Sequence, residues 1–223
     1  RVRIGYNETI SVPYAEIKIP GLDMLVNLSH RENHNNPLKS QVHANFKFRR
    51  KYQPLVDEIE AEWRRQLRED SIFLGKAIDS NFEFLNLESA EAAVRRLVYT
   101  DAEFTQLDAN VFIPIRQPER MRQVGFSLRR TVLLVGDYGT GKTLTALEAA
   151  LRAVDFGWTF MLVRPGHDIA TSLDFAKQYQ PCVVFFEDID EQTAGTRDTA
   201  LNGILNTIDG ILSKDAEVIT ILT

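Results

Sequence analysis

Several protein classes are excluded by what this sequence lacks. It has a single cysteine, Cys182, which excludes a disulfide framework and a paired-cysteine zinc site within its 223 residues. No apolar run reaches the roughly 18–20 residues that a transmembrane helix requires, and no signal-peptide pattern is visible, so we expect a cytoplasmic protein. Its 26 Lys and Arg against 31 Asp and Glu give a net charge of −5, which excludes nucleic-acid binding through bulk positive charge.

The pattern of apolar residues changes near residue 105 and indicates two domains. Residues 1–105 show short β-rich pieces and separate helical stretches, which predict a small α+β domain. Residues 106–223 alternate apolar runs with helical patterns, which predict an α/β domain built on a parallel sheet. A chain of 223 residues is long enough for two such domains.

The first domain contains one strongly amphipathic helix, predicted over residues 54–68. Its apolar residues recur at every fourth position and form a single stripe, made of Leu55, Ile59, Trp63 and Leu67. The other elements predicted in this domain are strands at 17–19, 24–28, 71–77 and 82–87, a polar loop at 29–40 and a helix at 88–98.

Strands and helices alternate regularly in the second domain. The predicted strands are 131–135, 159–163, 183–186 and 218–222, and the predicted helices are 142–154, 168–179 and 199–209. These strands are almost continuously apolar, as expected for strands that are buried on both faces. The sequence therefore predicts an α/β fold with helices on both faces of a parallel sheet, preceded by the smaller α+β domain.

The most specific motif lies between the first of these strands and the helix that follows it. Residues 136–143 read G-D-Y-G-T-G-K-T and match the phosphate-loop (Walker A) pattern G-x-x-x-x-G-K-[ST]. Glycines bring backbone N–H groups onto phosphate oxygens, Lys142 supplies a long cation, and Thr143 supplies a hydroxyl for Mg²⁺. The residues predicted to bind ATP and Mg are Gly136, Asp137, Tyr138, Gly139, Thr140, Gly141, Lys142, Thr143 and Leu144.

A second motif places two carboxylates after a buried strand, in the manner of a Walker B motif. The apolar run 183–186 is followed by Glu187 and Asp188, and ligands of parallel sheets bind at the carboxyl ends of the strands. We expect Glu187 to hold Mg²⁺ and Asp188 to orient and deprotonate the attacking water, which makes them catalytic residues together with Lys142. The alternative interpretation is a solvated acidic turn.

The order of this acidic pair is unusual. Such pairs normally read Asp then Glu, whereas here Glu187 precedes Asp188. The shorter Asp188 side chain would hold a water about one methylene farther away. Either hydrolysis is slowed, or the backbone compensates, and the sequence leaves both interpretations open.

Residues 111–223 resemble the first half of the module of AAA-family (AAA+) ATPases. The resemblance rests on ordered motifs around the phosphate loop: the lead-in F-I-P-I-R-Q-P-E at 112–119, the strand R-T-V-L-L-V at 130–135, the helix L-N-G-I-L-N-T-I-D-G at 201–210 and the strand at 218–223. Residues 1–105 carry no comparable resemblance.

The resemblance implies several properties. It implies a sheet of order 5-1-4-3-2, a Mg-ATP site between subunits of a homo-oligomeric ring, usually a hexamer, and chaperone-like coupling of ATP hydrolysis to the remodelling of a protein partner. It also implies that residues 108–115 lie against the adenine base. The fifth strand, the arginine fingers and the lid are expected beyond Thr223.

Two features depart from the pattern of family members that thread peptides. Between residues 163 and 181 there is no aromatic-apolar-Gly pore loop, and the two carboxylates are reversed. Together these features resemble the branch of the family that includes the mitochondrial Rieske-protein translocase and moves folded cargo.

Three functions compete on this evidence. The leading one is an oligomeric ATPase that remodels a protein bound by the N-terminal domain. The second is a nucleotide-gated assembly or binding module in which hydrolysis is slow or absent. The third is a nucleic-acid-remodelling ATPase, supported only by the aromatic and basic residues interleaved over 46–52, so nucleic acid is not the expected partner.

Overall fold

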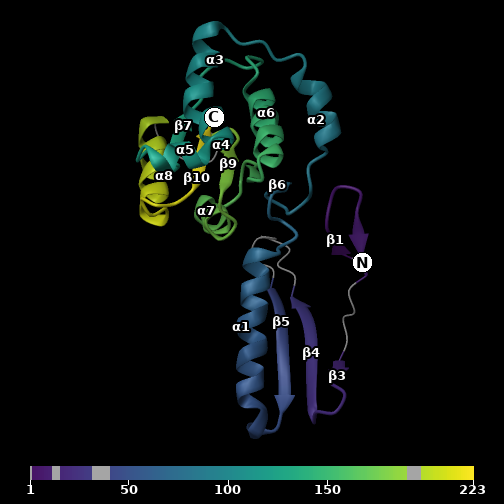
Figure 1. Ribbon diagram of the computed structural model, residues 1–223. Coiled ribbons are helices and arrows are strands. Elements are labelled where there is room, and N and C mark those ends of the chain that lie inside the picture. Colours follow the sequence, from purple (N-terminus) through teal and green to yellow (C-terminus); the bar gives the residue numbers. More distant parts are fainter. Residues whose placement is uncertain (1, 12–15, 32–40, 190–196) are drawn as a thin grey trace. The chain divides into compact units, whose positions relative to one another are not determined.

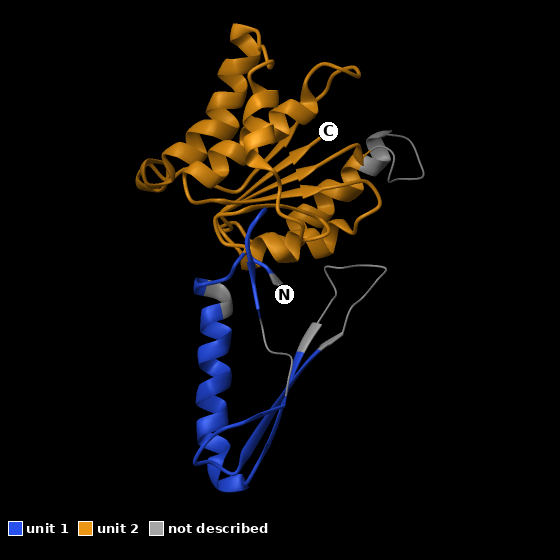
Figure 2. Cartoon of the chain, turned by 90° about the vertical axis from the view of Figure 1, so that its right-hand side faces the viewer, with its two compact units in different colours: residues 1–72 blue, residues 73–223 orange. Residues whose placement is uncertain are grey.

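The computed structural model describes residues 2–11, 16–31, 41–189 and 197–223 (Figure 1). The chain divides into two compact units, residues 1–72 and residues 73–223, which are coloured separately in Figure 2. The sequence pattern predicts a boundary between residues 105 and 106, whereas the units divide between Ile72 and Phe73. Among the described residues, no helix is both long enough and apolar enough to cross a membrane.

Unit 1 is an antiparallel sheet with one long helix. Its strands are β1 (Val2–Arg3) and β2 (Thr9–Ile10), which pair with each other, and β3 (Glu16–Lys18), β4 (Met24–Arg31) and β5 (Gln41–Phe48), which form a three-stranded sheet in that order. The short 3₁₀ helix η2 (Arg50–Tyr52) leads into helix α1 (Gln53–Glu69), close to the predicted span 54–68. The predicted loop at 29–40 lies mostly outside the described residues.

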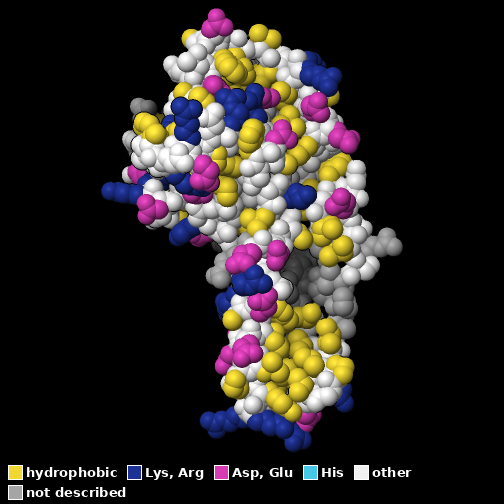
Figure 3. All heavy atoms as spheres, in the orientation of Figure 1, with side chains coloured by type: hydrophobic (Ala, Val, Ile, Leu, Met, Phe, Trp, Pro, Cys, Tyr) yellow, Lys and Arg dark blue, Asp and Glu magenta, His cyan; other side chains and the backbone are white. Residues whose placement is uncertain are grey.

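The sheet of unit 1 is apolar on the face that it turns to α1. Met24 and Val26 are buried on this face, and the ring of Phe46 lies 5.4 Å from that of Trp63 in α1. Hydrophobic side chains gather over this sheet beside the helix (Figure 3). The start of the aromatic and basic stretch, residues 46–48, therefore follows the two faces of β5, because Lys47 is exposed where Phe46 and Phe48 are half-buried.

Unit 2 is built on a five-stranded parallel sheet of order β6-β8-β9-β10-β7. The strands are β6 (Ala77–Asp79), β7 (Arg130–Leu133), β8 (Thr159–Val163), β9 (Cys182–Phe186) and β10 (Val218–Leu222). Every residue of β8, β9 and β10 is buried, and helices lie on both faces of the sheet (Figure 2). This confirms the predicted fold class.

The helices of unit 2 include the three that the sequence predicts at 142–154, 168–179 and 199–209, together with several others between β6 and β7. They are α2 (Leu87–Val94), α3 (Asp101–Leu107), the π-helix η3 (Asp108–Phe112), α4 (Ile113–Arg116), α5 (Pro118–Gln123), α6 (Lys142–Asp155), α7 (Ile169–Gln178) and α8 (Arg197–Ile211). Small residues of α6, such as Ala146 and Ala149, pack with Val183 and Phe185 of β9 in the main core. Close packing of these alanines holds the start of α6 at one edge of the sheet.

Residues 73–105 belong to unit 2 for two reasons. Strand β6 pairs in parallel with β8 and extends the sheet beyond the strand order that the family resemblance implies. Helix α2 packs against α6. The predicted strands at 71–77 and 82–87 are wrong, except that Ala77 begins β6 and Phe84 forms an isolated bridge to Ile78.

The apolar alternation over residues 71–87 has another cause than strand formation. Its aromatic residues pack with two rings of α7 and the residue after it, in a cluster of Phe73, Phe82, Phe84, Phe175 and Tyr179. Ring centroids in this cluster are 4.4 to 6.1 Å apart. A turn in which Phe82 adopts a φ of 60° aims its ring at this cluster, so the period-two pattern arises without a strand.

Candidate functional site

The loop between β7 and α6 has a backbone that only its glycines permit. Gly139 and Gly141 have φ angles of 80° and 94°, which L-residues with a side chain rarely adopt. A Cβ on Gly136 would lie 2.8 Å from Oγ1 of Thr140. The three glycines of the phosphate-loop pattern are thus required by conformation or by close approach, which leaves the backbone N–H groups of the loop uncovered by side chains.

The loop is held by its own polar groups. The Lys142 ammonium donates to the carbonyl oxygens of Gly136 at 2.7 Å and Asp137 at 3.0 Å. The hydroxyl of Thr140 donates to the carbonyl of Asp137 at 2.8 Å. Tyr138 is 92% exposed, and its ring centroid lies 5.8 Å from Nζ of Lys142. The cation therefore lies over the loop itself, where an anion bound by the loop would meet it.

Helix α6 begins directly at the end of this loop. Gly141 is its N-cap residue, and Lys142, Thr143 and Leu144 form its first turn. The first N–H groups of a helix have no partner within the helix, and the helix dipole adds partial positive charge there. Thr143 is exposed and Leu144 is half-buried. This arrangement favours an anion, above all a phosphate, at the start of α6.

The strand register brings the phosphate loop and the acidic pair to the same edge of the sheet. Leu133 of β7 and Phe186 of β9 are both paired with Leu222 of β10, which lies between them. The chain leaves β9 at Glu187, two strand spacings (roughly 10 Å) from the strand that feeds the loop. Two motifs separated by about 45 residues in sequence thus share one end of a parallel sheet.

Glu187 and Asp188 are both half-buried, and their backbones are fixed by neighbouring strands. The N–H of Glu187 donates to the carbonyl of Val163 in β8 at 3.0 Å. The N–H of Asp188 donates to Oγ1 of Thr223 at 3.2 Å, and Asp188 has a φ of 45°. The left-handed backbone at Asp188 turns the chain sharply after β9, so the two carboxylates do not simply continue the alternation of the strand.

A cavity of about 320 Å³ lies beside the phosphate loop. Its walls come from three parts of the chain: residues 98–110, which include α3 and part of η3; β7 and the residues after it; and the start of α6. The lining residues include Val98, Tyr99, Glu103, Gln106, Leu107, Asn110, Val132, Leu134, Gly136, Lys142 and Thr145. The mixture of an aromatic ring, aliphatic side chains and carboxamides is suited to a flat heteroaromatic group.

The segment expected against the adenine base, residues 108–115, contributes only Asn110 to this cavity. Val111, Phe112 and Ile115 are buried in the core, and Asp108 forms an ion pair with Arg116 at 2.7 Å. Residues 98–107 contribute a larger part of the cavity wall. None of the sequence motifs described above includes them. The T-x-x-E spacing of Thr100 and Glu103, a capping box that begins α3, is the one sequence signal that marked this segment.

The residues at this edge fit the phosphates of a nucleotide and a magnesium ion. Side chains at Gly136 or Gly141 would collide with Thr140 of the loop or with Leu97 beside it, so the loop keeps its form only with glycine at these positions. The Thr143 hydroxyl and the Glu187 carboxylate are oxygen donors, the type that Mg²⁺ prefers. Cys182, which precedes this edge on β9, is fully buried, and burial raises the pKa of its thiol, so it is a packing residue.

A phosphate loop between a strand and a helix of a parallel sheet defines a P-loop nucleotide-binding domain. Comparison with known proteins agrees: residues 132–223 match the model of the "ATPase family associated with various cellular activities (AAA)". The matched residues make up less than half of the chain, and they show that this C-terminal segment is similar to the AAA family.

Curated proteins with similar sequences carry related names. An ATP-dependent zinc metalloprotease FtsH 1 of Salinibacter ruber is 31% identical over 156 residues, or 60% of this chain and 23% of that protein. An FtsH of Acidothermus cellulolyticus is 33% identical over 49% of this chain and 19% of its own length. A proteasome-activating nucleotidase of Methanoculleus marisnigri is 30% identical over 52% of this chain and 30% of its own length. The chain thus spans less than a third of each of these relatives.

Proposed function

We propose that this protein binds Mg-ATP and hydrolyses it, and that hydrolysis drives the remodelling or translocation of a protein partner. The observation that carries the proposal is the phosphate loop, whose backbone depends on its glycines and leads directly into helix α6. The loop lies at the same edge of the sheet as Glu187 and Asp188. That combination provides both a binding site for phosphates and carboxylates for metal and water.

Each residue of the site has a proposed role. The backbone of residues 136–144 and the Lys142 ammonium bind the phosphates, and Thr143 and Glu187 hold magnesium. Magnesium, when bound, would neutralise charge that develops on the phosphates. Asp188 orients the attacking water and accepts its proton. Its own left-handed backbone sets the direction in which its short side chain points.

The partner is proposed to be a protein. The names of the relatives, an ATP-dependent metalloprotease and a proteasome-activating nucleotidase, describe proteins that act with proteolytic machinery. The AAA resemblance further suggests a homo-oligomeric ring, usually of six subunits. We propose that residues 1–72, the part of the predicted N-terminal domain 1–105 that forms unit 1, bind the substrate or an adaptor. The cytoplasmic location stays a prediction of the sequence.

The test separates nucleotide binding from turnover. In the full-length protein, Lys142→Ala should lose ATP binding, because it removes the cation that lies over the loop. Asp188→Asn should bind ATP like the wild type but release no phosphate. Lys177→Ala, on α7, is a control that should change neither measurement. Equal rates of phosphate release in wild type and Asp188→Asn would refute the role of Asp188.

A second function is favoured by one observation, the conjunction of the reversed acidic pair with the strained turn at Asp188. If the Asp188 carboxylate does not hold the attacking water near the phosphate, the protein hydrolyses ATP slowly and acts as an assembly module that responds to nucleotide binding. This second function predicts tight ATP binding without turnover. It also predicts an ATP-dependent increase in molecular mass, measured by light scattering. A mass that is the same with and without ATP would exclude it.

A further inference from the structure

The segment that follows helix α2 touches the phosphate loop at its last glycine. A Cβ placed on Gly141 would lie 2.9 Å from Cδ1 of Leu97. The Leu97 side chain therefore covers the Cα of Gly141 where α6 begins. Gly141 has a φ of 94°, so the contact lies at the point where the backbone changes from the loop into the helix.

A hydrogen-bond relay joins the same segment to Gly141 from the other side. The hydroxyl of Tyr99 donates to Oγ1 of Thr145 at 3.2 Å. The hydroxyl of Thr145 in turn donates to the carbonyl oxygen of Gly141 at 3.1 Å. Thr145 is buried, and burial raises the pKa of Tyr99, which keeps the phenol protonated and able to donate.

Tyr99 also lines the cavity beside the loop, together with Thr145 and Lys142. The Tyr99 ring is therefore part of the cavity wall that would face a nucleotide base. Its hydroxyl begins the hydrogen-bond relay that ends at the Gly141 carbonyl. Leu97 and Tyr99 follow α2, which packs against α6. The relay thus starts in the irregular segment between α2 and α3, next to a helix that packs against α6.

We propose that Leu97 and Tyr99 form a latch that positions the phosphate loop, with Tyr99 as a positioning residue that links the base cavity to the phosphate-binding backbone. This inference rests on the proposed binding of ATP. The Tyr99 ring contributes to the cavity, while its hydroxyl acts on the phosphates only through Thr145 and Gly141. Removal of the hydroxyl should therefore weaken the grip on the phosphates and leave the base contact intact.

The experiment measures affinity for ATP, ADP and adenosine in the full-length protein by competition against a fluorescent ATP analogue. Tyr99→Phe keeps the ring and should lower the affinity for ATP and ADP about three- to ten-fold, the range for loss of one hydrogen bond. Its affinity for adenosine should match that of the wild type. Tyr179→Phe, in the aromatic cluster against α7, is a matched control that should bind all three like the wild type.

A second pair of variants tests the relay at its middle. Thr145→Val removes the hydroxyl and should reproduce the loss of ATP affinity, whereas Thr145→Ser keeps the hydroxyl and should restore it. Combining Tyr99→Phe with Thr145→Val should weaken binding no more than Thr145→Val alone, because both variants break one relay.

Two results would overturn the latch while the proposed function stands. One is unchanged ATP affinity in Tyr99→Phe when the wild type binds ATP. The other is an equal loss for adenosine and ATP, which would confine Tyr99 to the wall of the cavity. A wild-type protein that binds no ATP would instead overturn the proposed function, and the latch with it.

Discussion

The backbone N–H of Asp188 donates a hydrogen bond to the hydroxyl oxygen of Thr223, 3.2 Å away. The same hydroxyl donates to the carbonyl of Phe186 at 3.3 Å. One threonine side chain therefore joins the end of β10 to the turn that follows β9. It fixes the backbone of Asp188 in a left-handed conformation (φ 45°) that a residue with a side chain adopts only when its surroundings hold it.

Thr223→Val should destabilise unit 2, because it leaves the Asp188 N–H without its partner, although the Phe186 carbonyl still accepts from the backbone N–H of residue 223. A loss of about 1–3 kcal/mol in the free energy of unfolding is expected for stranding such groups. Thr223→Ser keeps the hydroxyl and should lose much less. Urea unfolding followed by circular dichroism measures both variants.

Thr220, three residues earlier on the same strand, provides the opposite control. Its side chain is fully buried, and among the described residues its hydroxyl has no hydrogen-bond partner. Thr220→Val should therefore leave stability unchanged or raise it by about 1 kcal/mol. A large loss in Thr220→Val would show that the effect at Thr223 is not specific to its hydrogen bonds.

Gly141→Ala should destabilise the protein and weaken nucleotide binding together. The variant forces a residue with a Cβ to a φ of 94° and drives the Leu97 side chain away. The left-handed conformation costs roughly 1–2 kcal/mol, partly offset by the lower entropy of the unfolded chain. Thermal unfolding and ATP titration are the measurements.

Gly203→Ala tests whether the effect at Gly141 comes from position or merely from loss of a glycine. Gly203 lies within α8, and a Cβ there meets nothing within 4 Å. Alanine is the better helix former, so this variant should gain about 0.5–1 kcal/mol of stability. Similar losses in both variants would contradict the conformational explanation.

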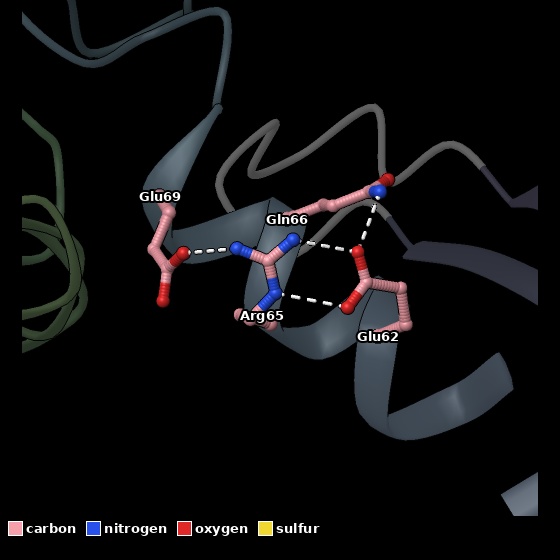
Figure 4. A network of polar contacts seen from close by, with 4 residues as sticks. All are labelled: Glu62, Arg65, Gln66 and Glu69. Atoms are coloured by element: carbon pink, nitrogen blue, oxygen red, sulfur yellow. Dashed lines mark hydrogen bonds and ion pairs between the residues drawn. The ribbon is translucent and has the colours of Figure 1, made fainter. Parts of the chain in front are cut away.

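A carboxylate on the surface of α1 predicts a pH effect. Glu62 accepts hydrogen bonds from Arg65 at 2.6 and 2.9 Å and from Gln66 at 2.9 Å, and Arg65 also binds Glu69 (Figure 4). The Arg65 and Gln66 hydrogen bonds lower the pKa of Glu62 from 4.5 to about 2. Since the folded pKa is depressed, the stabilisation is complete above pH 4.5 and is lost as the pH falls toward about 2.

Glu62→Gln should therefore reduce the loss of helical signal on acidification within that window. The network is exposed, so the difference from the wild type should be small and should shrink at high salt. Circular dichroism at 222 nm, recorded against pH, is the measurement. Glu58→Gln, on the same helix but outside the network, is the control; an equal change in both variants would refute the assignment to Glu62.

Cys182 should be inert toward thiol reagents in the folded protein. It is fully buried on β9, and burial raises its pKa, so both access and thiolate formation are suppressed. A chromogenic disulfide reagent should detect no thiol in the native protein and one after unfolding in guanidinium. Rapid reaction of the native protein would contradict the placement of β9 at the centre of the sheet.

The phosphate loop and the parallel sheet were predictable because their determinants are local. The backbone of the loop requires the glycines at 136, 139 and 141. The apolar runs of β8, β9 and β10 predict strands that are buried on both faces. The family resemblance supplied the order of four strands, which periodicity alone does not contain.

The parts that escaped prediction depend on contacts between distant segments. Strand β6 is three residues long and exists because it pairs with β8, about 80 residues later. The aromatic residues around it mimic strand alternation while packing on α7. In the same way, the contact of Tyr99 with Thr145 joins residues 46 positions apart, and the capping box that follows Tyr99 marks only the start of α3, not this contact.

The position of β6 bears on how this domain can be excised. A fragment that starts at residue 132, where the family match begins, or at residue 106 would leave the edge of β8 unpaired. Bare edges of sheets recruit other chains and promote aggregation. A fragment that starts at residue 73 retains that strand, the helix packed on α6 and the Leu97–Tyr99 segment, and so sets the natural N-terminal limit for isolating a well-behaved nucleotide-binding domain.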